Sequence, residues 1–173
     1  MLLSLPHRTT LRPRTGQTTE VVVEMTIPGK AHVVQPEEGR SIDLGVASMR
    51  FIASGETTGS AFTVAEMSGT TQGPWTVPHL HRGFEESFYV LDGLFTFSVG
   101  EERIEAAPGS FVLVPRCTAH TFEAAAGGGK FLLLMVPGGL EEMFLELANL
   151  PGDAIRDPAV RAAVSARYDS VPV

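Results

Sequence analysis

The feature that most constrains the fold is a succession of short apolar runs, each bounded by turn residues. From residue 31 onward these runs are four to eight residues long, and turns rich in Gly, Pro and Ser separate them. Many short strands with this punctuation are typical of an antiparallel sandwich or barrel, so the sequence predicts an all-β domain. The expected strands lie in AHVVQP, SIDLGVA, MRFIAS, SAFTVAEM, VPHLH, ESFYVLD, LFTFSV, ERIEAA, SFVLVP, HTFEA and KFLLLMVP.

Two breaks that contain glycine are expected to be turns between these strands. Asp92-Gly93 lies between two apolar runs, and an Asp-Gly pair in that setting is a strong signal for a β-hairpin. The glycine run at 127–129 separates the last two expected strands in the same way.

The period of the apolar residues changes near the end of the chain, where two helices are expected to pack against the outside of the β-domain. The second helix should begin at DPAVRAAVSARY, with Asp157 as its N-cap and Pro158 at its first position. In the first, apolar residues recur at i, i+3, i+4 and i+7, which marks one helical face: Leu140, Met143, Phe144 and Leu147.

The length of 173 residues suits one domain with flanking segments. Residues 1–24 are rich in Thr and Arg, show no period, and are expected to form a flexible arm that is neither a secretory signal nor a membrane span. The β-domain is expected over residues 25–137, with Met25 a candidate for the biological start, and the helices over residues 138–173.

The charge and cysteine content exclude several classes of partner. A net charge of −7 argues against nucleic acid and anionic membranes, since both require a basic face. The single cysteine, Cys117, excludes an internal disulfide, so nothing requires an oxidising compartment and a cytoplasmic location is expected.

The first residues that could carry chemistry are His79 and His81. Residues two apart on a strand point to the same face, about 6.6 Å apart along the chain, whereas a helix would direct them to opposite sides. The pair therefore suits a strand that presents both rings to one ligand. Two ordinary exposed or core histidines are the alternative interpretation.

Two further polar residues are expected to point into the same interior. Strand alternation places Glu86 on one face with Phe88 and Val90, and His120 with Phe122. Because buried, unpaired ionisable groups are costly, three histidines and a carboxylate converging there are best explained by one divalent transition metal. The donor set suits Fe, Mn, Co, Ni, Cu or Zn and does not choose among them.

At these residues the chain resembles the cupins. Their first motif, G-x5-H-x-H-x4-E-x6-G, is matched with every spacing kept by Gly73, His79, His81, Glu86 and Gly93.

The second cupin motif is matched in part, within APGSFVLVPRCTAHTFEA. Pro115 and His120 are in place, whereas Cys117 and Ala124 stand where the family usually has glycine and asparagine. The cysteine puts the geometry of the turn before His120 in doubt.

The resemblance implies a jelly-roll β-barrel that holds a metal through His79, His81, Glu86 and His120. It also implies frequent dimerisation, so a homodimer is one expected state. The uninterrupted FLLLMV fits a strand buried on both sides, as either a barrel core or a dimer interface would provide.

Aromatic and aliphatic residues on the strands could line a substrate pocket, although simple core packing gives the same composition. Trp75 could cover the mouth of the barrel or merely pack beside it. The candidate substrate-binding residues are Phe88, Val90, Phe97, Phe111 and Phe122.

The leading functional prediction is a metal-dependent dioxygenase that acts on a small aromatic, flavonoid or polyketide-like molecule. Glu86 would serve as both ligand and proton acceptor, and single-cupin quercetinases are the nearest named resemblance. The fold alone does not fix the activity. Two alternatives stay open: a non-oxidative cyclase or isomerase that uses the metal as a Lewis acid, and a small-molecule-binding cupin without catalysis.

Overall fold

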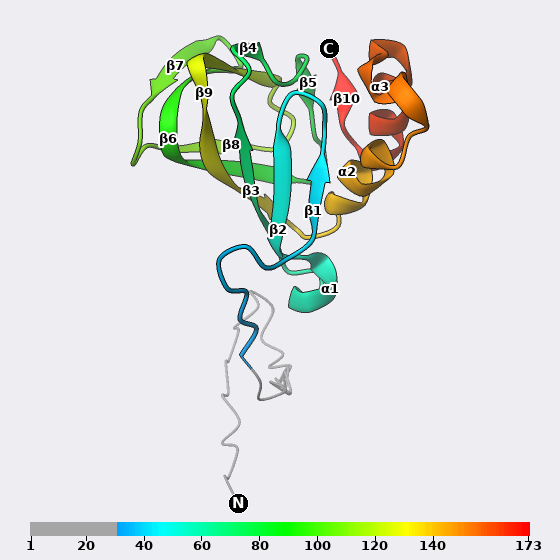
Figure 1. Ribbon diagram of the computed structural model, residues 1–173. Coiled ribbons are helices and arrows are strands. Elements are labelled where there is room, and N and C mark those ends of the chain that lie inside the picture. Colours follow the sequence, from blue (N-terminus) through cyan, green and yellow to red (C-terminus); the bar gives the residue numbers. More distant parts are fainter. Residues whose placement is uncertain (1–30) are drawn as a thin grey trace, which may run out of the picture. The chain divides into compact units, whose positions relative to one another are not determined.

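The computed structural model describes residues 31–173, and residues 34–173 form one unit of antiparallel strands followed by helices (Figure 1). The predicted arm at 1–24 and the candidate start at Met25 lie outside the described residues. The strands are β1 Ser41–Asp43, β2 Ser48–Ala53, β3 Thr63–Gly69, β4 Gly73–Pro74, β5 His79–Leu80, β6 Glu85–Val99, β7 Glu102–Ala106, β8 Phe111–Val114, β9 His120–Val136 and β10 Val171–Pro172. The helices are α1 Gly55–Thr58, α2 Glu141–Ala148 and α3 Pro158–Ser165, with 3-10 turns η1 Gly152–Arg156 and η2 Ala166–Tyr168.

Two long strands, β6 and β9, connect the two halves of the barrel. Residues 129–136 of β9 pair with β3 on one side and with the first half of β6 on the other. Residues 120–124 of β9 pair with the second half of β6 and with β4 and β5. In Figure 1 these strands curve through the left part of the domain, whereas β1 and the C-terminal helices lie together on the right.

The two expected glycine turns are wrong, because both segments lie inside these long strands. Gly93 pairs with Gly129 across β6 and β9, and the register shifts on either side of it. The positive φ of Gly93, 78°, bends β6 there and does not reverse the chain. A Cβ atom at Gly93 would lie 2.3 Å from the carbonyl oxygen of Gly128, so the strands approach too closely for any side chain.

Two other strand expectations also need correction. Residues 31–35 are irregular and not a strand. In FLLLMV only one face is fully buried, the one that carries Phe131, Leu133 and Met135, whereas Leu132 and Leu134 are half-buried.

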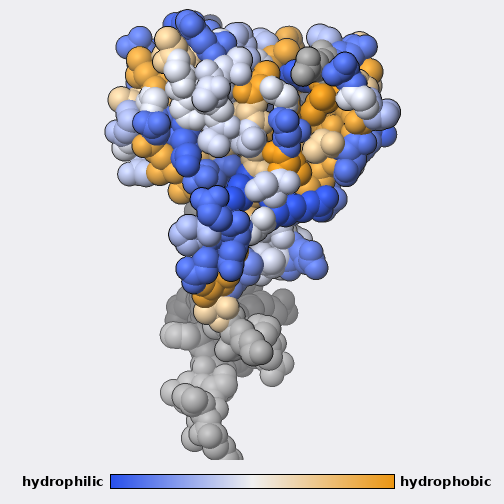
Figure 2. Space-filling view, in the orientation of Figure 1, coloured by the Kyte–Doolittle hydropathy of each residue, from blue (hydrophilic) through white to orange (hydrophobic). Residues whose placement is uncertain are grey.

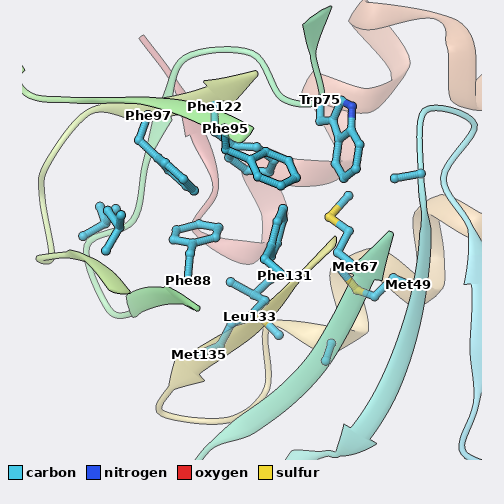
Figure 3. Packing of buried hydrophobic residues seen from close by; sticks show 14 of the residues in the cluster. Met49, Met67, Trp75, Phe88, Phe95, Phe97, Phe122, Phe131, Leu133 and Met135 are labelled. Carbon is cyan, nitrogen blue, oxygen red and sulfur yellow. The ribbon is translucent and has the colours of Figure 1, made fainter. Parts of the chain in front are cut away.

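The barrel interior is filled by aromatic rings (Figure 3). Phe95 and Phe131 meet edge to face with ring centroids 5.1 Å apart, and Trp75 meets Phe95 in the same way at 5.3 Å. Edge-to-face pairs at these distances are favourable, because the positive ring edge meets the negative ring face. Each of five phenylalanines is at most 4% exposed: Phe88, Phe95, Phe97, Phe122 and Phe131.

The two predicted C-terminal helices are confirmed. Asp157 caps α3 by accepting a hydrogen bond from the N–H of Ala159 at 2.8 Å, with Pro158 at the first helical position. In α2, Met143 and Leu147 are buried, together with Leu140 just before it. No helix in residues 31–173 is both long and apolar enough to cross a membrane.

A buried carboxylate connects α2 to the barrel. Glu141 accepts hydrogen bonds from the hydroxyl of Thr63 and the N–H of Gly55, both at 2.5 Å, and from the N–H of Gly139 at 2.7 Å. Burial acts to raise the pKa of Glu141, but these hydrogen bonds hold it below its ordinary value. The ionised side chain therefore fixes the start of α2 against β3.

We expect Gly93→Ala to lower the free energy of unfolding by about 3 kcal/mol or more. The left-handed backbone costs roughly 1–2 kcal/mol with a side chain present, and the overlap with Gly128 adds about 1–3 kcal/mol. Gly127→Ala is the matched control, since Gly127 also has a positive φ, 91°, but a Cβ there meets nothing within 4 Å. Urea denaturation should show a smaller loss of unfolding free energy in Gly127→Ala than in Gly93→Ala. Equal losses would contradict the close approach of Gly93 to the backbone of Gly128.

Candidate metal centre and the cavity beside it

Four polar side chains from three strands and one loop converge at one end of the barrel. His79 in β5 and His120 in β9 are direct partners in the sheet. His81 follows β5, and Glu86 lies near the start of β6. All four residues are buried, and their ligand atoms lie within 4.8 Å of one another. The structure thus brings together the four residues that the sequence singled out.

Backbone carbonyl groups fix the same tautomer in all three histidines. Nδ1 of His79 lies 2.8 Å from the oxygen of Val77, and Nδ1 of His120 lies 3.0 Å from the oxygen of Thr118. Nδ1 of His81 lies 2.9 Å from a third carbonyl oxygen. Because a carbonyl oxygen only accepts, each Nδ1 carries the hydrogen, and each Nε2 is left to face the cluster.

The Nε2 atoms crowd around one carboxylate oxygen. Oε2 of Glu86 lies 3.1 Å from Nε2 of His120 and 3.6 Å from Nε2 of His81. Nε2 of His81 is buried without a hydrogen-bond partner among the described residues. Lone pairs that face a carboxylate in a dry interior repel it unless a cation lies between them. The cation is either a proton on an imidazole or a metal ion that replaces it.

The electrostatics of the cluster agree with this requirement. Burial and the neighbouring His120 lower the pKa of His79 to about 4, so its ring is neutral at pH 7. Burial acts to raise the pKa of Glu86, but the imidazoles of His120 and His81 hold it well below its ordinary value. A neutral imidazole at His79 and an ionised carboxylate at Glu86 are the protonation states that a metal ion binds. Burial acts to lower the pKa of His81, but the carboxylate of Glu86 raises it above its ordinary value, so a proton competes with a metal ion at that ring.

The donor set fits a divalent transition metal. Imidazole suits Zn, Cu, Fe and Ni, and a carboxylate adds the charge that favours a divalent ion. Ligand atoms about 2.1 Å from one ion lie roughly 3–4 Å apart, which is close to the spacing already present. A metal would therefore need only small movements of the Nε2 atoms of His79, His81 and His120 and of Oε2 of Glu86.

The third carbonyl group belongs to Asp169, close to the end of the chain. While its backbone oxygen accepts from Nδ1 of His81, its carboxylate Oδ2 accepts from the N–H groups of Arg82 at 2.8 Å and Gly83 at 2.6 Å. Strand β10 follows at once and pairs with β5 at His79. This last segment, residues 169–173, therefore fixes the loop that presents two of the three histidines. Asp169 cannot be identified from the sequence, because nothing local to DSVPV signals the contact.

Cys117 shows how the altered second motif still positions His120. It adopts a φ of 61°, the left-handed conformation that glycine takes most easily, and its N–H donates to the oxygen of His81 at 2.6 Å. The turn geometry is kept, and the hydrogen bond ties this turn to the His81 loop. The thiol itself is exposed.

A cavity of about 140 Å³ lies between the barrel and the C-terminal helices, and His79 forms part of its wall. Trp75 and Val77 line the barrel side, and residues of α2 and α3 line the other. Figure 2 shows apolar residues gathered where β1 and these helices lie. An apolar cavity of this size holds about one aromatic ring. The described residues of the lining are Leu44, Val46, Met67, Trp75, Thr76, Val77, His79, Met143, Phe144, Leu147, Ile155, Pro158, Arg161, Ala162, Ser165, Ser170 and Pro172.

The predicted substrate-binding residues do not line this cavity. Phe88, Val90, Phe97 and Phe122 are buried in the packed core, so substrate contact at these positions stays a prediction. Phe111 lies in β8 with its side chain 61% exposed, away from this cavity, and substrate contact there likewise stays a prediction. The aromatic residues of the interior pack against one another, whereas the cavity is built by the helices that the sequence assigned only to packing.

Residues 65–137 match the family model of the cupin domain. This chain contains a cupin domain. All four candidate ligands lie within the matched residues, and Asp169 and the helices α2 and α3 follow them. The domain keeps both motif glycines, Gly73 and Gly93, with positive φ.

Two curated relatives are quercetin 2,3-dioxygenases. The one from Bacillus subtilis (strain 168) is 30% identical over 118 residues, which are 68% of this chain and 35% of that protein. The one from Aspergillus japonicus is 27% identical over 127 residues, which are 70% of this chain and 36% of that protein. The chain thus spans about a third of the length of these relatives.

Solved structures confirm the predicted cupin jelly-roll fold. KdgF from Halomonas sp. matches with a TM-score of 0.56 at 18% identity, over 65% of this chain and 99% of that one. The polyketide cyclase RemF from Streptomyces resistomycificus matches with a TM-score of 0.54 at 21% identity, over 62% of this chain and 80% of that one. At these identities the likeness concerns the fold alone.

We expect Asp169→Ala to weaken Zn²⁺ binding about 10-fold, since groups that orient metal-bound histidines contribute on that scale. Asp169→Asn keeps one acceptor oxygen in its side chain, so its Zn²⁺ affinity should fall less than that of Asp169→Ala. Titration of the metal-free protein against a zinc chelator measures both affinities. The control is Asp43→Ala, which removes a carboxylate that accepts from the N–H of Gly45 in another turn. Unchanged affinity in folded Asp169→Ala protein would show that the last segment does not orient His81.

Proposed function

We propose that this protein is a metal-dependent dioxygenase that acts on a small aromatic or flavonoid-like substrate. The observation that carries the proposal is the position of the four-residue cluster beside an apolar cavity, with His79 common to both. A site of this kind would hold a metal ion next to a cavity that accommodates the aromatic ring of a substrate.

The donor set supports an open metal site. Three imidazoles and one carboxylate on an octahedral ion leave about two positions for other ligands. A bound transition metal would supply Lewis acidity and one-electron chemistry at this point. His79, His81, Glu86 and His120 would hold it.

The chain's own residues would shield a bound ring from water and place a carboxylate close to it. Trp75 is 3% exposed and forms part of the cavity wall, so a ring bound there would be shielded from water. Glu86 is buried near the start of β6, where its Oε2 lies 3.1 Å and 3.6 Å from the Nε2 atoms of His120 and His81. A carboxylate in that position can accept a proton from a substrate hydroxyl group, since a general base must lie within hydrogen-bond reach of the proton it takes.

The relatives support the same reaction class. Both curated relatives are dioxygenases that act on quercetin by name, and the similarity covers more than two thirds of this chain. Because this chain spans only about a third of their length, the reaction itself is part of the proposal.

We expect Glu86→Gln to lower kcat by about 100-fold or more for oxygen uptake with quercetin, the scale of general base catalysis. The assay uses protein loaded in turn with Fe, Mn, Co, Ni or Cu, and rates are expressed per bound metal. Glu85→Gln is the matched control, because the neighbouring Glu85 is half-exposed and pairs with Arg116 at 3.4 Å.

Two outcomes would count against the proposal in different ways. Full turnover by Glu86→Gln would end the proton-acceptor role. Conversion of substrate without oxygen uptake would replace the dioxygenase with a cyclase or isomerase that uses the metal as a Lewis acid.

A further inference from the structure

One guanidinium group lies in the otherwise apolar wall of the cavity. Among the described residues of the lining, Arg161 carries the positive charge at neutral pH, and none of them is an Asp or Glu. An anionic ligand would therefore meet attraction without a competing carboxylate.

Helix α3 directs Arg161 to the cavity by its spacing. Pro158, Arg161, Ala162 and Ser165 lie at i, i+3, i+4 and i+7, which is one helical face, and all four line the cavity. Leu147 and other residues of α2 continue the same wall. The arginine is thus placed by the helix and not by a mobile loop.

Arg161 has no ion pair and no side-chain hydrogen bond within residues 31–173. Its neighbour along the chain, Arg167, is different, since it pairs with Glu146. Arg50 likewise pairs with Glu66, at 3.5 Å. A half-buried guanidinium without a partner retains its full capacity for a bidentate contact with a carboxylate.

We propose that the cavity binds an aromatic carboxylate, with the ring between Trp75 and α2 and the carboxylate on Arg161. The inference rests on the proposed function in that it names the substrate class of the same site. The cavity has room for about one ring. A single arginine matches the one charge of a carboxylate, whereas a doubly charged phosphate is usually held by several donors.

The position of Arg161 also sets the orientation of the ligand. Arg161 lies on the helical wall, and His79 lies on the barrel wall. A ligand whose carboxylate contacts Arg161 can therefore present the other end of its ring toward the metal centre. In this arrangement the acid group serves recognition and takes no part in the chemistry.

The test measures binding, so that it does not depend on turnover. Trp75 is the only tryptophan in the chain and lines the cavity, which makes its fluorescence a direct report of occupancy. The protein is loaded with Zn²⁺, and the probes are phenylacetate and phenylacetamide, which share a shape and differ in charge. We expect phenylacetate to bind about 10-fold more tightly or better, since hydrogen bonds to charged groups contribute on that scale.

In Arg161→Gln we expect the affinity for phenylacetate to fall about 10-fold or more, whereas that for phenylacetamide stays within about twofold. Arg161→Lys keeps the charge without the planar pair of donors, so its affinity for phenylacetate should lie between those of the unaltered protein and Arg161→Gln. Arg40→Gln is the matched control, because it removes the same charge from an exposed side chain that does not line the cavity.

Two results would overturn the assignment of Arg161. The first is equal affinity for the two probes in the unaltered protein. The second is a preference for phenylacetate that survives Arg161→Gln and disappears without Zn²⁺, which would place the carboxylate on the metal. Binding through Arg161 combined with no oxygen uptake by the Fe-, Mn-, Co-, Ni- or Cu-loaded protein would instead refute the dioxygenase proposal and leave this one standing.

Discussion

The structure depends on three hydrogen bonds from histidine Nδ1 atoms to backbone carbonyl groups. They fix which nitrogen of each ring is free, and the fold then directs the three free nitrogens toward the carboxylate of Glu86. All four residues of this cluster are buried, and aromatic rings fill the barrel interior beside it. The need for a cation at this point therefore follows from backbone geometry and burial before any particular metal is considered.

Two of these carbonyl groups are local, and the third comes from the far end of the chain. Val77 and Thr118 each lie two residues from the histidine they serve, whereas Asp169 lies 88 residues from His81. The segment that carries Asp169 follows the helices that wall the cavity. The region after the matched cupin domain thus takes part both in orienting a ligand of the metal and in shaping the space beside it.

The sequence predicted the parts of the fold and the site that depend on local spacing. The H-x-H pair, the strand alternation around Glu86 and the cap of α3 at Asp157 each involve residues close in the chain, and each is found in the structure. The assignment of Asp92-Gly93 to a hairpin failed for a physical reason. A positive φ bends a strand as readily as it reverses a chain, and only the distant Gly128 decides between the two.

The cavity between the barrel and the helices could not be predicted from the sequence either, because it also depends on contacts between distant residues. Inward aromatic residues are needed by a packed core and by a pocket alike, so composition cannot separate Phe97, which is fully buried, from Trp75, which borders the cavity. The cavity lies between the barrel and the helices α2 and α3. The position of α2 depends on contacts between elements far apart in sequence, such as those that Glu141 makes with Gly55 and Thr63.

The central claim is that three histidines and one glutamate form a single metal site. Mass spectrometry of the native purified protein and of His120→Ala, together with X-ray absorption at the metal edge, tests it most directly. The account predicts close to one transition-metal ion per chain, bound by three imidazoles and a carboxylate, and its loss from the folded variant. A folded protein that stays free of metal after exposure to Fe, Mn, Co, Ni, Cu and Zn ions would contradict it.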